Sequence, residues 1–153
     1  MGNSERKSNS IPQVNNPQGL AEMLAQIIDG PKSKQELNLV LKLRDREFSY
    51  RIAALNFFGL ISKSNSRPGV WSWSQIRSES SGITASHASL LLQKAIRDWN
   101  TDELGLRSGL DNTEYEIWEA LSGPNFKKVG QKTMARRVSS YKKLVHWALE
   151  REN

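Results

Sequence analysis

Residues 57–73, FFGLISKSNSRPGVWSW, decide the fold of this 153-residue chain. Helices commonly end at a glycine, so Gly59 predicts the end of a helix. The Leu60–Lys63 segment that follows is typical of a strand. Residues 64–69 are rich in turn formers. Val70–Ser74 alternates large and small side chains with the period of two expected for a strand. The stretch therefore predicts a helix followed by a β-hairpin with a polar, basic tip.

Three helices are predicted before the hairpin. Apolar side chains recur at helical spacing from Pro17 to Gly30, where Gly-Pro ends the first helix. Ser33 and Glu36 have the spacing of a capping box, which begins a short second helix. A third helix follows at about Arg46–Phe58. The side chains expected to face the core are Leu20, Met23, Leu24, Ile27 and Ile28, then Leu37, Val40 and Leu41, then Phe48, Ile52 and Leu55.

This order of elements resembles a winged helix-turn-helix domain over residues 17–76. In winged-helix regulators the recognition helix ends in a Gly-Leu-Ile-like step into the wing, as at Gly59–Ile61, and the wing returns through a glycine and an aromatic strand, as at 69–73. The resemblance implies that the third helix enters the major groove of duplex DNA. We therefore expect a mainly α-helical protein: a winged helix with a two-stranded wing, then about three C-terminal helices.

The third helix also carries a polar face. On a helical wheel, Arg46, Tyr50 and Ala53 lie opposite the apolar side, with Ser49 and Asn56 at the flank. Arginine and asparagine can bind base edges, and a small alanine permits close approach to them. By resemblance, phosphate contacts come from the turn before this helix, from the wing and from the start of the second helix, that is, from Arg44, Lys63, Arg67, Lys32 and Lys34.

Residues 84–153 are predicted to form three helices, at about Thr84–Trp99, at Tyr115–Leu121 and at Gln131–Arg151. An apolar stripe on the last helix is expected to pack on the first of these, within or between chains. Residues 84–153 therefore form either a dimerisation and partner-docking layer or a second nucleic-acid module. The stripe residues are Met134, Val138, Tyr141 and Val145, and the basic side chains are Lys127, Lys128, Lys132, Arg136, Arg137 and Lys143.

Charge alternates along the chain. Residues 32–77 hold nine basic and three acidic side chains, a net charge of +6. Residues 98–119 hold seven acids and one base, a net −6, and residues 127–143 hold seven bases and no acid. The overall charge of +6 favours a polyanionic partner, most often nucleic acid. The acidic block is either a set of solvated helix faces or a region that repels a polyanion and so orients it.

Composition excludes several kinds of site. Cysteine is absent, which excludes thiol catalysis and Cys-containing zinc sites, and the two histidines are too few for a histidine-rich metal site. Residues 123–133 lack the contiguous Gly-Lys-Thr of a phosphate-binding loop. We expect no membrane span, a flexible polar arm at residues 1–16, no cofactor and no enzymatic activity. The expected location is cytoplasmic or nucleoid-associated, or nuclear in a eukaryote.

Together these features predict a sequence-specific duplex DNA-binding protein, with a winged-helix domain at 17–77 and a helical region at 84–153. It would act as a transcriptional regulator or as a DNA-binding accessory of a mobile element, plasmid or defence system. Two alternatives stay open. One is a non-enzymatic adaptor that docks a protein in a nucleoprotein complex. The other is a single-strand or RNA binder that stacks bases on Trp71 and Trp73, which we otherwise expect to pack in the core.

Overall fold

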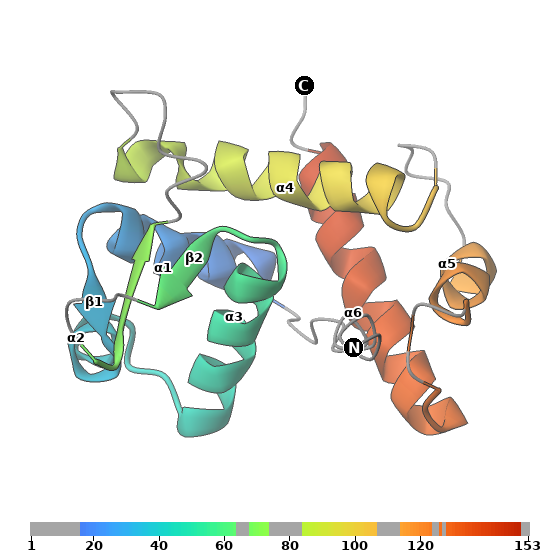
Figure 1. Cartoon of the computed structure of the whole chain (residues 1–153), viewed down its shortest axis with the longest axis horizontal. Coiled ribbons are helices and arrows are strands. Elements are labelled where there is room, and N and C mark those ends of the chain that lie inside the picture. Colours follow the sequence, from blue (N-terminus) through green and yellow to red (C-terminus); the bar gives the residue numbers. More distant parts are fainter. Residues whose placement is uncertain are drawn as a thin grey trace, which may run out of the picture.

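The computed structural model describes residues 16–63, 68–73, 84–106, 114–123, 126 and 128–150. The first half contains α1 (Pro17–Ile28), β1 (Lys32–Ser33), α2 (Lys34–Leu41), α3 (Asp45–Phe57), β2 (Ile61–Lys63) and β3 (Val70–Trp73). The second half contains the 3-10 helix η3 (Ala85–His87), α4 (Ala88–Asp102), α5 (Glu114–Leu121) and α6 (Gln131–Glu150). In Figure 1, α4 lies along the top of the molecule with α1 below it, and α3 and α6 both descend from that layer.

The expected class, mainly helical with a small antiparallel sheet, is confirmed. Among the described residues, no helix combines the length and the apolar character needed to span a membrane.

The helix end that opens the deciding stretch forms as its sequence predicts. Gly59 adopts the left-handed region, with φ of 72°. The N–H groups of Gly59 and Leu60 donate to the carbonyl oxygens of Asn56 and Leu55 at 3.0 Å each. These two bonds form a Schellman motif, which closes α3 and turns the chain directly into β2.

The predicted hairpin is present, but the sheet has one more strand than expected. β2 and β3 pair antiparallel, with Ile61 opposite Trp73, and β1 pairs with the other edge of β3, giving the order β1-β3-β2. A strand as short as β1 shows no alternation from which it could be predicted. The expected capping box follows it: Ser33 Oγ accepts from the Glu36 N–H at 3.2 Å, and Glu36 Oε1 accepts from the Ser33 N–H at 2.8 Å.

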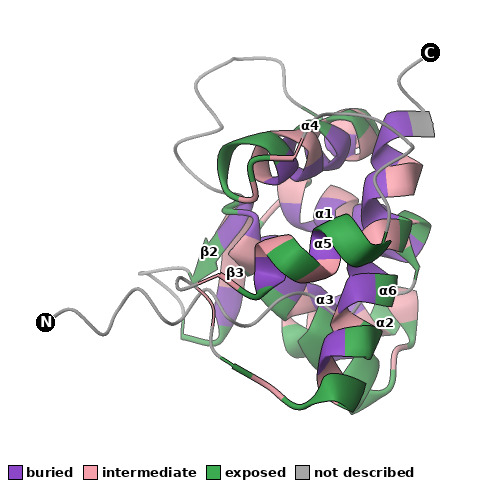
Figure 2. Ribbon diagram, turned by 90° about the vertical axis from the view of Figure 1, so that its right-hand side faces the viewer, coloured by how far each residue is buried: buried purple, intermediate pink, exposed green. Residues whose placement is uncertain are grey.

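One apolar core joins the two halves of the chain. α6 packs its stripe on α4, and α4 packs on α1, so the buried faces meet in the middle of the molecule (Figure 2). Tyr141 is fully buried and donates its hydroxyl to Asn100 Oδ1 at 2.7 Å. Burial raises the pKa of Tyr141 well above its ordinary value, so the phenol keeps the proton that it donates. The α6 stripe is thus covered within the chain, which removes it as the surface of a dimer.

One predicted core position, Val40, is corrected. Val40 is 57% exposed, because α2 is short and turns only Leu37 of its apolar side chains fully inward. The last residue of α3, Phe57, packs on the second half of the chain. Its ring contacts those of Phe58 and Trp99, with centroids 5.2 and 4.8 Å away, because α4 returns across the end of α3.

A buried arginine joins α3 to α1. The Arg51 side chain is 9% exposed and its Nη1 donates to the Gly19 carbonyl oxygen at 3.1 Å. A Cβ added at Gly19 would lie 2.5 Å from Arg51 Nη2. A side chain at position 19 would therefore require the Arg51 guanidinium to shift from its hydrogen bond.

This contact predicts that the effect of Gly19→Ala on the free energy of unfolding changes sign when Arg51 is also replaced. Gly19→Ala should destabilise the parent by about 1–2 kcal/mol, because the displaced guanidinium loses a charge-assisted hydrogen bond. In an Arg51→Ala background the same change should stabilise by about 0.5–1 kcal/mol, because alanine favours a helix over glycine. Urea unfolding of the four proteins measures both values. Equal effects of Gly19→Ala in the two backgrounds would contradict the contact.

Candidate nucleic-acid interface

The polar face of α3 is exposed along the whole helix. Arg46, Ser49, Tyr50, Ala53 and Asn56 are all exposed, as the helical wheel predicted. The opposite side of the helix is fixed to the core, where the buried residues are Phe48, Arg51, Ala54 and Leu55. α3 therefore forms a ridge whose polar side chains project outward from a rigid base.

A hollow of about 540 Å³ separates this ridge from the sheet. We call it the sheet-side hollow. Phe48 and Trp71 meet edge to face beneath it, with ring centroids 5.6 Å apart. Lys34 stands at its rim, paired with Asp45 at 3.0 Å and placed 5.5 Å from the Phe48 ring centroid. The lining residues are Lys34, Phe48, Ser49, Ile52, Ala53, Asn56, Lys63 and Trp71.

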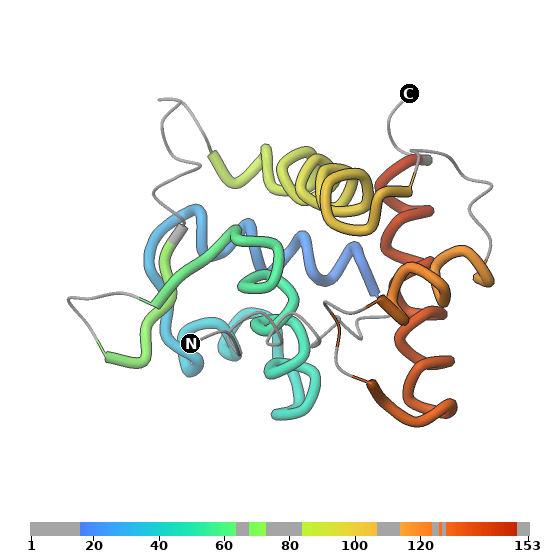
Figure 3. The backbone as a smooth tube through the Cα atoms, turned by 45° about the vertical axis from the view of Figure 1, so that its right-hand side comes forward, coloured from blue at the N-terminus to red at the C-terminus, as the bar shows by residue number. Residues whose placement is uncertain are grey.

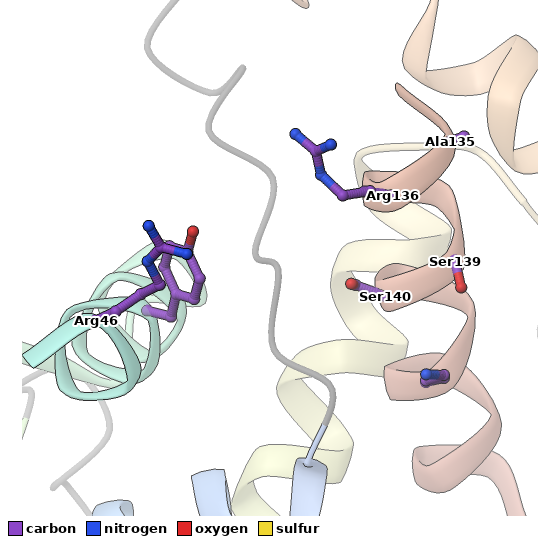
Figure 4. Close-up of a pocket in the computed structure, with 7 residues that line it drawn as sticks. Arg46, Ala135, Arg136, Ser139 and Ser140 are labelled. Carbon is purple, nitrogen blue, oxygen red and sulfur yellow. The ribbon is translucent and has the colours of Figure 1, made fainter. Parts of the chain in front are cut away.

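A second hollow, of about 800 Å³, lies on the other side of the ridge, between α3 and α6. We call it the α6-side hollow. Figure 4 shows Arg46 on α3 and Arg136 reaching out from α6 toward it, with Ser139 and Ser140 below. The smooth trace in Figure 3 shows the same separation of α3 from α6 in a second view. The lining residues are Arg46 and Tyr50 from α3, and Ala135, Arg136, Ser139, Ser140 and Lys143 from α6.

The two basic regions of the sequence thus meet at one place. Arg46 belongs to the first region and Arg136 and Lys143 to the second, yet all three line the α6-side hollow. Every ionisable lining residue of that hollow other than Tyr50 is basic, and α6 carries no acid from residue 131 to residue 149. Glu114 is near: it lines a neighbouring hollow of about 430 Å³ together with Lys143.

The remaining predicted site residues have different surroundings. Arg44 is exposed just before α3, and its backbone N–H donates to Glu47 Oε1 at 3.4 Å. Lys63 is exposed on β2. Lys32 is half-buried, and its Nζ donates to the carbonyl oxygens of Gln26 and Gly30 at 2.9 and 3.3 Å. Lys32 therefore holds the end of α1, a role that the sequence did not suggest.

The basic side chains proposed in residues 127–143 also differ in their surroundings. Lys128 and Lys132 are exposed but line neither the sheet-side nor the α6-side hollow. Arg137 is half-buried, and its pKa is lowered from the ordinary value by burial and by the neighbouring charge of Arg136. Arg67 and Lys127 lie outside the described residues. Of the α6 residues proposed from the sequence, Arg136 and Lys143 are the two that face α3.

Sequence reasoning did not single out Arg51 or Trp99. Arg51 follows Phe48 by three residues and precedes Leu55 by four, so its place on the apolar stripe was readable from spacing alone. The contacts of Trp99 with Phe57 and Tyr141 depend on the tertiary fold, which brings the two halves of the chain together.

A scan against protein-family models and searches of curated proteins and of solved structures found no match to this chain. Among the described residues, no group of three or more His, Cys, Asp or Glu side chains is placed to hold a metal ion.

Proposed function

We propose that the protein binds duplex DNA through a winged-helix module in which α3 enters the major groove. The observation that carries this proposal is the exposed polar ridge of α3, flanked on both sides by basic hollows. The order helix, strand, helix, helix, strand, strand, with the sheet order β1-β3-β2, supports the winged-helix class. In this arrangement Arg46 and Asn56 bind base edges, while Lys34, Arg44 and Lys63 bind phosphates.

The electrostatics favour a phosphate partner. Lys34 is held by one exposed ion pair with Asp45, and such a pair stabilises a protein by at most about 1 kcal/mol, so a phosphate can compete for the lysine. The Trp71 side chain packs against Phe48 and is only half-exposed, which argues against stacking of unpaired bases on Trp71. We propose that the protein acts as a transcriptional regulator or as a DNA-binding accessory of a mobile element, plasmid or defence system.

One observation favours a second candidate, an adaptor that docks a protein. Leu39 and Val40 lie side by side in α2 and are 77% and 57% exposed. Contiguous exposed apolar patches mark sites of protein interaction, and these two neighbours could form the centre of one. An adaptor would bind its partner at high salt, whereas a DNA reader would lose its ligand there.

Selection of bound sequences from a random duplex pool, followed by salt titration of the best sequence, tests the proposal. We expect one enriched motif. The logarithm of the binding constant should fall with the logarithm of salt concentration with a slope of about −3 or steeper, because the exposed Lys34, Arg44 and Lys63 each neutralise about one phosphate. A pool without any enriched motif, bound no better than single strands, would overturn the proposal.

A further inference from the structure

The exposed ridge of α3 has two edges, and each edge faces a different element. Ser49 and Asn56 line the sheet-side hollow, together with Lys34 and Lys63. Tyr50 lines the α6-side hollow. At 100° per residue Tyr50 and Asn56 are about 120° apart around the helix, so a ligand seated on the ridge would meet both hollows at once.

Duplex DNA has a shape that matches this arrangement. The major groove is about 12 Å wide, and an α-helix with its side chains is about 10–12 Å across. A helix in the groove therefore has one phosphodiester strand along each of its sides. With α3 in the groove, one strand lies beside Lys34 and Lys63, and the other must pass between α3 and α6.

We propose that the α6-side hollow holds the phosphodiester backbone of this second strand, with Arg136 and Lys143 as its ligands. The proposal rests on the DNA-binding function proposed above and names the strand and the residues that α6 contributes. Arg136 and Lys143 are seven residues apart, which places them about 10 Å apart along α6. Each strand carries one phosphate per about 3.4 Å of axis, so the pair spans about three phosphates. The exposed Ser139 lies between them as a hydroxyl donor.

The hollow is held open by the core rather than by the ligand. The face of α6 opposite Arg136 is buried through Met134, Val138 and Tyr141, and Tyr141 is fixed by its hydrogen bond to Asn100. Trp99 lies between the α3 end and α6, since its ring contacts both Phe57 and Tyr141. The cations of α6 are therefore positioned before DNA arrives.

Acidic side chains limit the surface on its far side. α5 packs against α6, and in Figure 1 it lies on the side of α6 away from α3. Its exposed acids are Glu116 and Glu119, and the exposed Glu114 at its start lines the neighbouring hollow that it shares with Lys143. A strand that left the α6-side hollow toward α5 would meet these carboxylates, so they confine the backbone to the side facing α3.

The test compares three variants of the full chain on the selected duplex. Arg136→Ala with Lys143→Ala should weaken binding about 10- to 100-fold at 0.1 M salt and reduce the steepness of the salt dependence by about 2. Lys94→Glu lowers the net charge by the same two units at an exposed lysine that lines neither hollow, and it should change affinity less than about threefold. Arg46→Ala with Asn56→Ala tests α3 itself. Phosphate ethylation interference then shows which strand each variant no longer contacts.

The outcomes separate the two proposals. If the α6 variant loses contacts on the strand not served by Lys34 and Lys63, the inference stands. If the α3 variant fails to bind while the α6 variant matches the lysine control in affinity and slope, the α6-side hollow is not a backbone site and the DNA-binding function remains. If the parent binds no duplex, both proposals are wrong. A thermal midpoint for the α6 variant within a few degrees of the parent excludes misfolding as the cause.

Discussion

Replacing Arg46 and Asn56 together with alanine should lower affinity for the selected duplex about 100-fold or more. Both side chains are exposed on α3, one above each hollow. A well-placed contact between such a side chain and a base edge contributes about 1–3 kcal/mol of discrimination, and the two sites face different parts of the groove, so their losses should nearly add. Fluorescence anisotropy at fixed salt measures the loss.

The two single variants should change base preference, whereas a variant of a phosphate-binding lysine should change the salt dependence. Arg46→Ala and Asn56→Ala should each relax preference at one or two base positions while leaving the salt slope nearly unchanged. Lys63→Ala should weaken all duplexes alike and lower the slope by about one. A double variant that binds within about threefold of the parent would show that this face of α3 does not read DNA, whatever the rest of the surface does.

Replacing Trp99 with alanine should destabilise the fold by about 2–4 kcal/mol, because this half-buried side chain packs where three helices meet. The Trp99 ring contacts those of Phe57, Phe58, Phe126 and Tyr141 at centroid distances of 4.8, 6.4, 6.2 and 5.5 Å. Its removal leaves a cavity where the end of α3 meets α4 and α6, and aromatic pairs at these distances add about 0.5–1.5 kcal/mol each to their burial.

Leu90→Ala is the matched control, because Leu90 lies on the same helix and is 63% exposed. We expect it to change the free energy of unfolding by less than about 0.5 kcal/mol. Denaturant unfolding followed by circular dichroism and by tryptophan fluorescence should give one coincident transition in the parent, because one core joins the two halves. Two separate transitions would show that the halves fold independently. A Trp99 variant as stable as the parent would show that the Trp99 contacts do not stabilise the fold.

Local patterns accounted for most of the helices and for the hairpin. The α1 and α6 stripes, the capping box at Ser33 and the turn at Gly59 depend on residues within a few positions of one another. Spacing therefore predicted them, together with the polar face of α3 that carries the proposed base contacts. β1 was missed because its pairing partner, β3, is far along the chain and its own pattern is too short.

The sequence by itself determined the element types, the exposed face of α3 and the excess of basic side chains. Only the tertiary structure decided that the apolar stripe of α6 packs on α4 and that Phe57 packs against Trp99. It also decided that Arg136 and Lys143 face Arg46 across one hollow. The physical reason is range. Helix caps, stripes and turns are selected by neighbours along the chain, whereas the meeting of α3 with α6 depends on how several amphipathic faces bury one another, which no local spacing encodes.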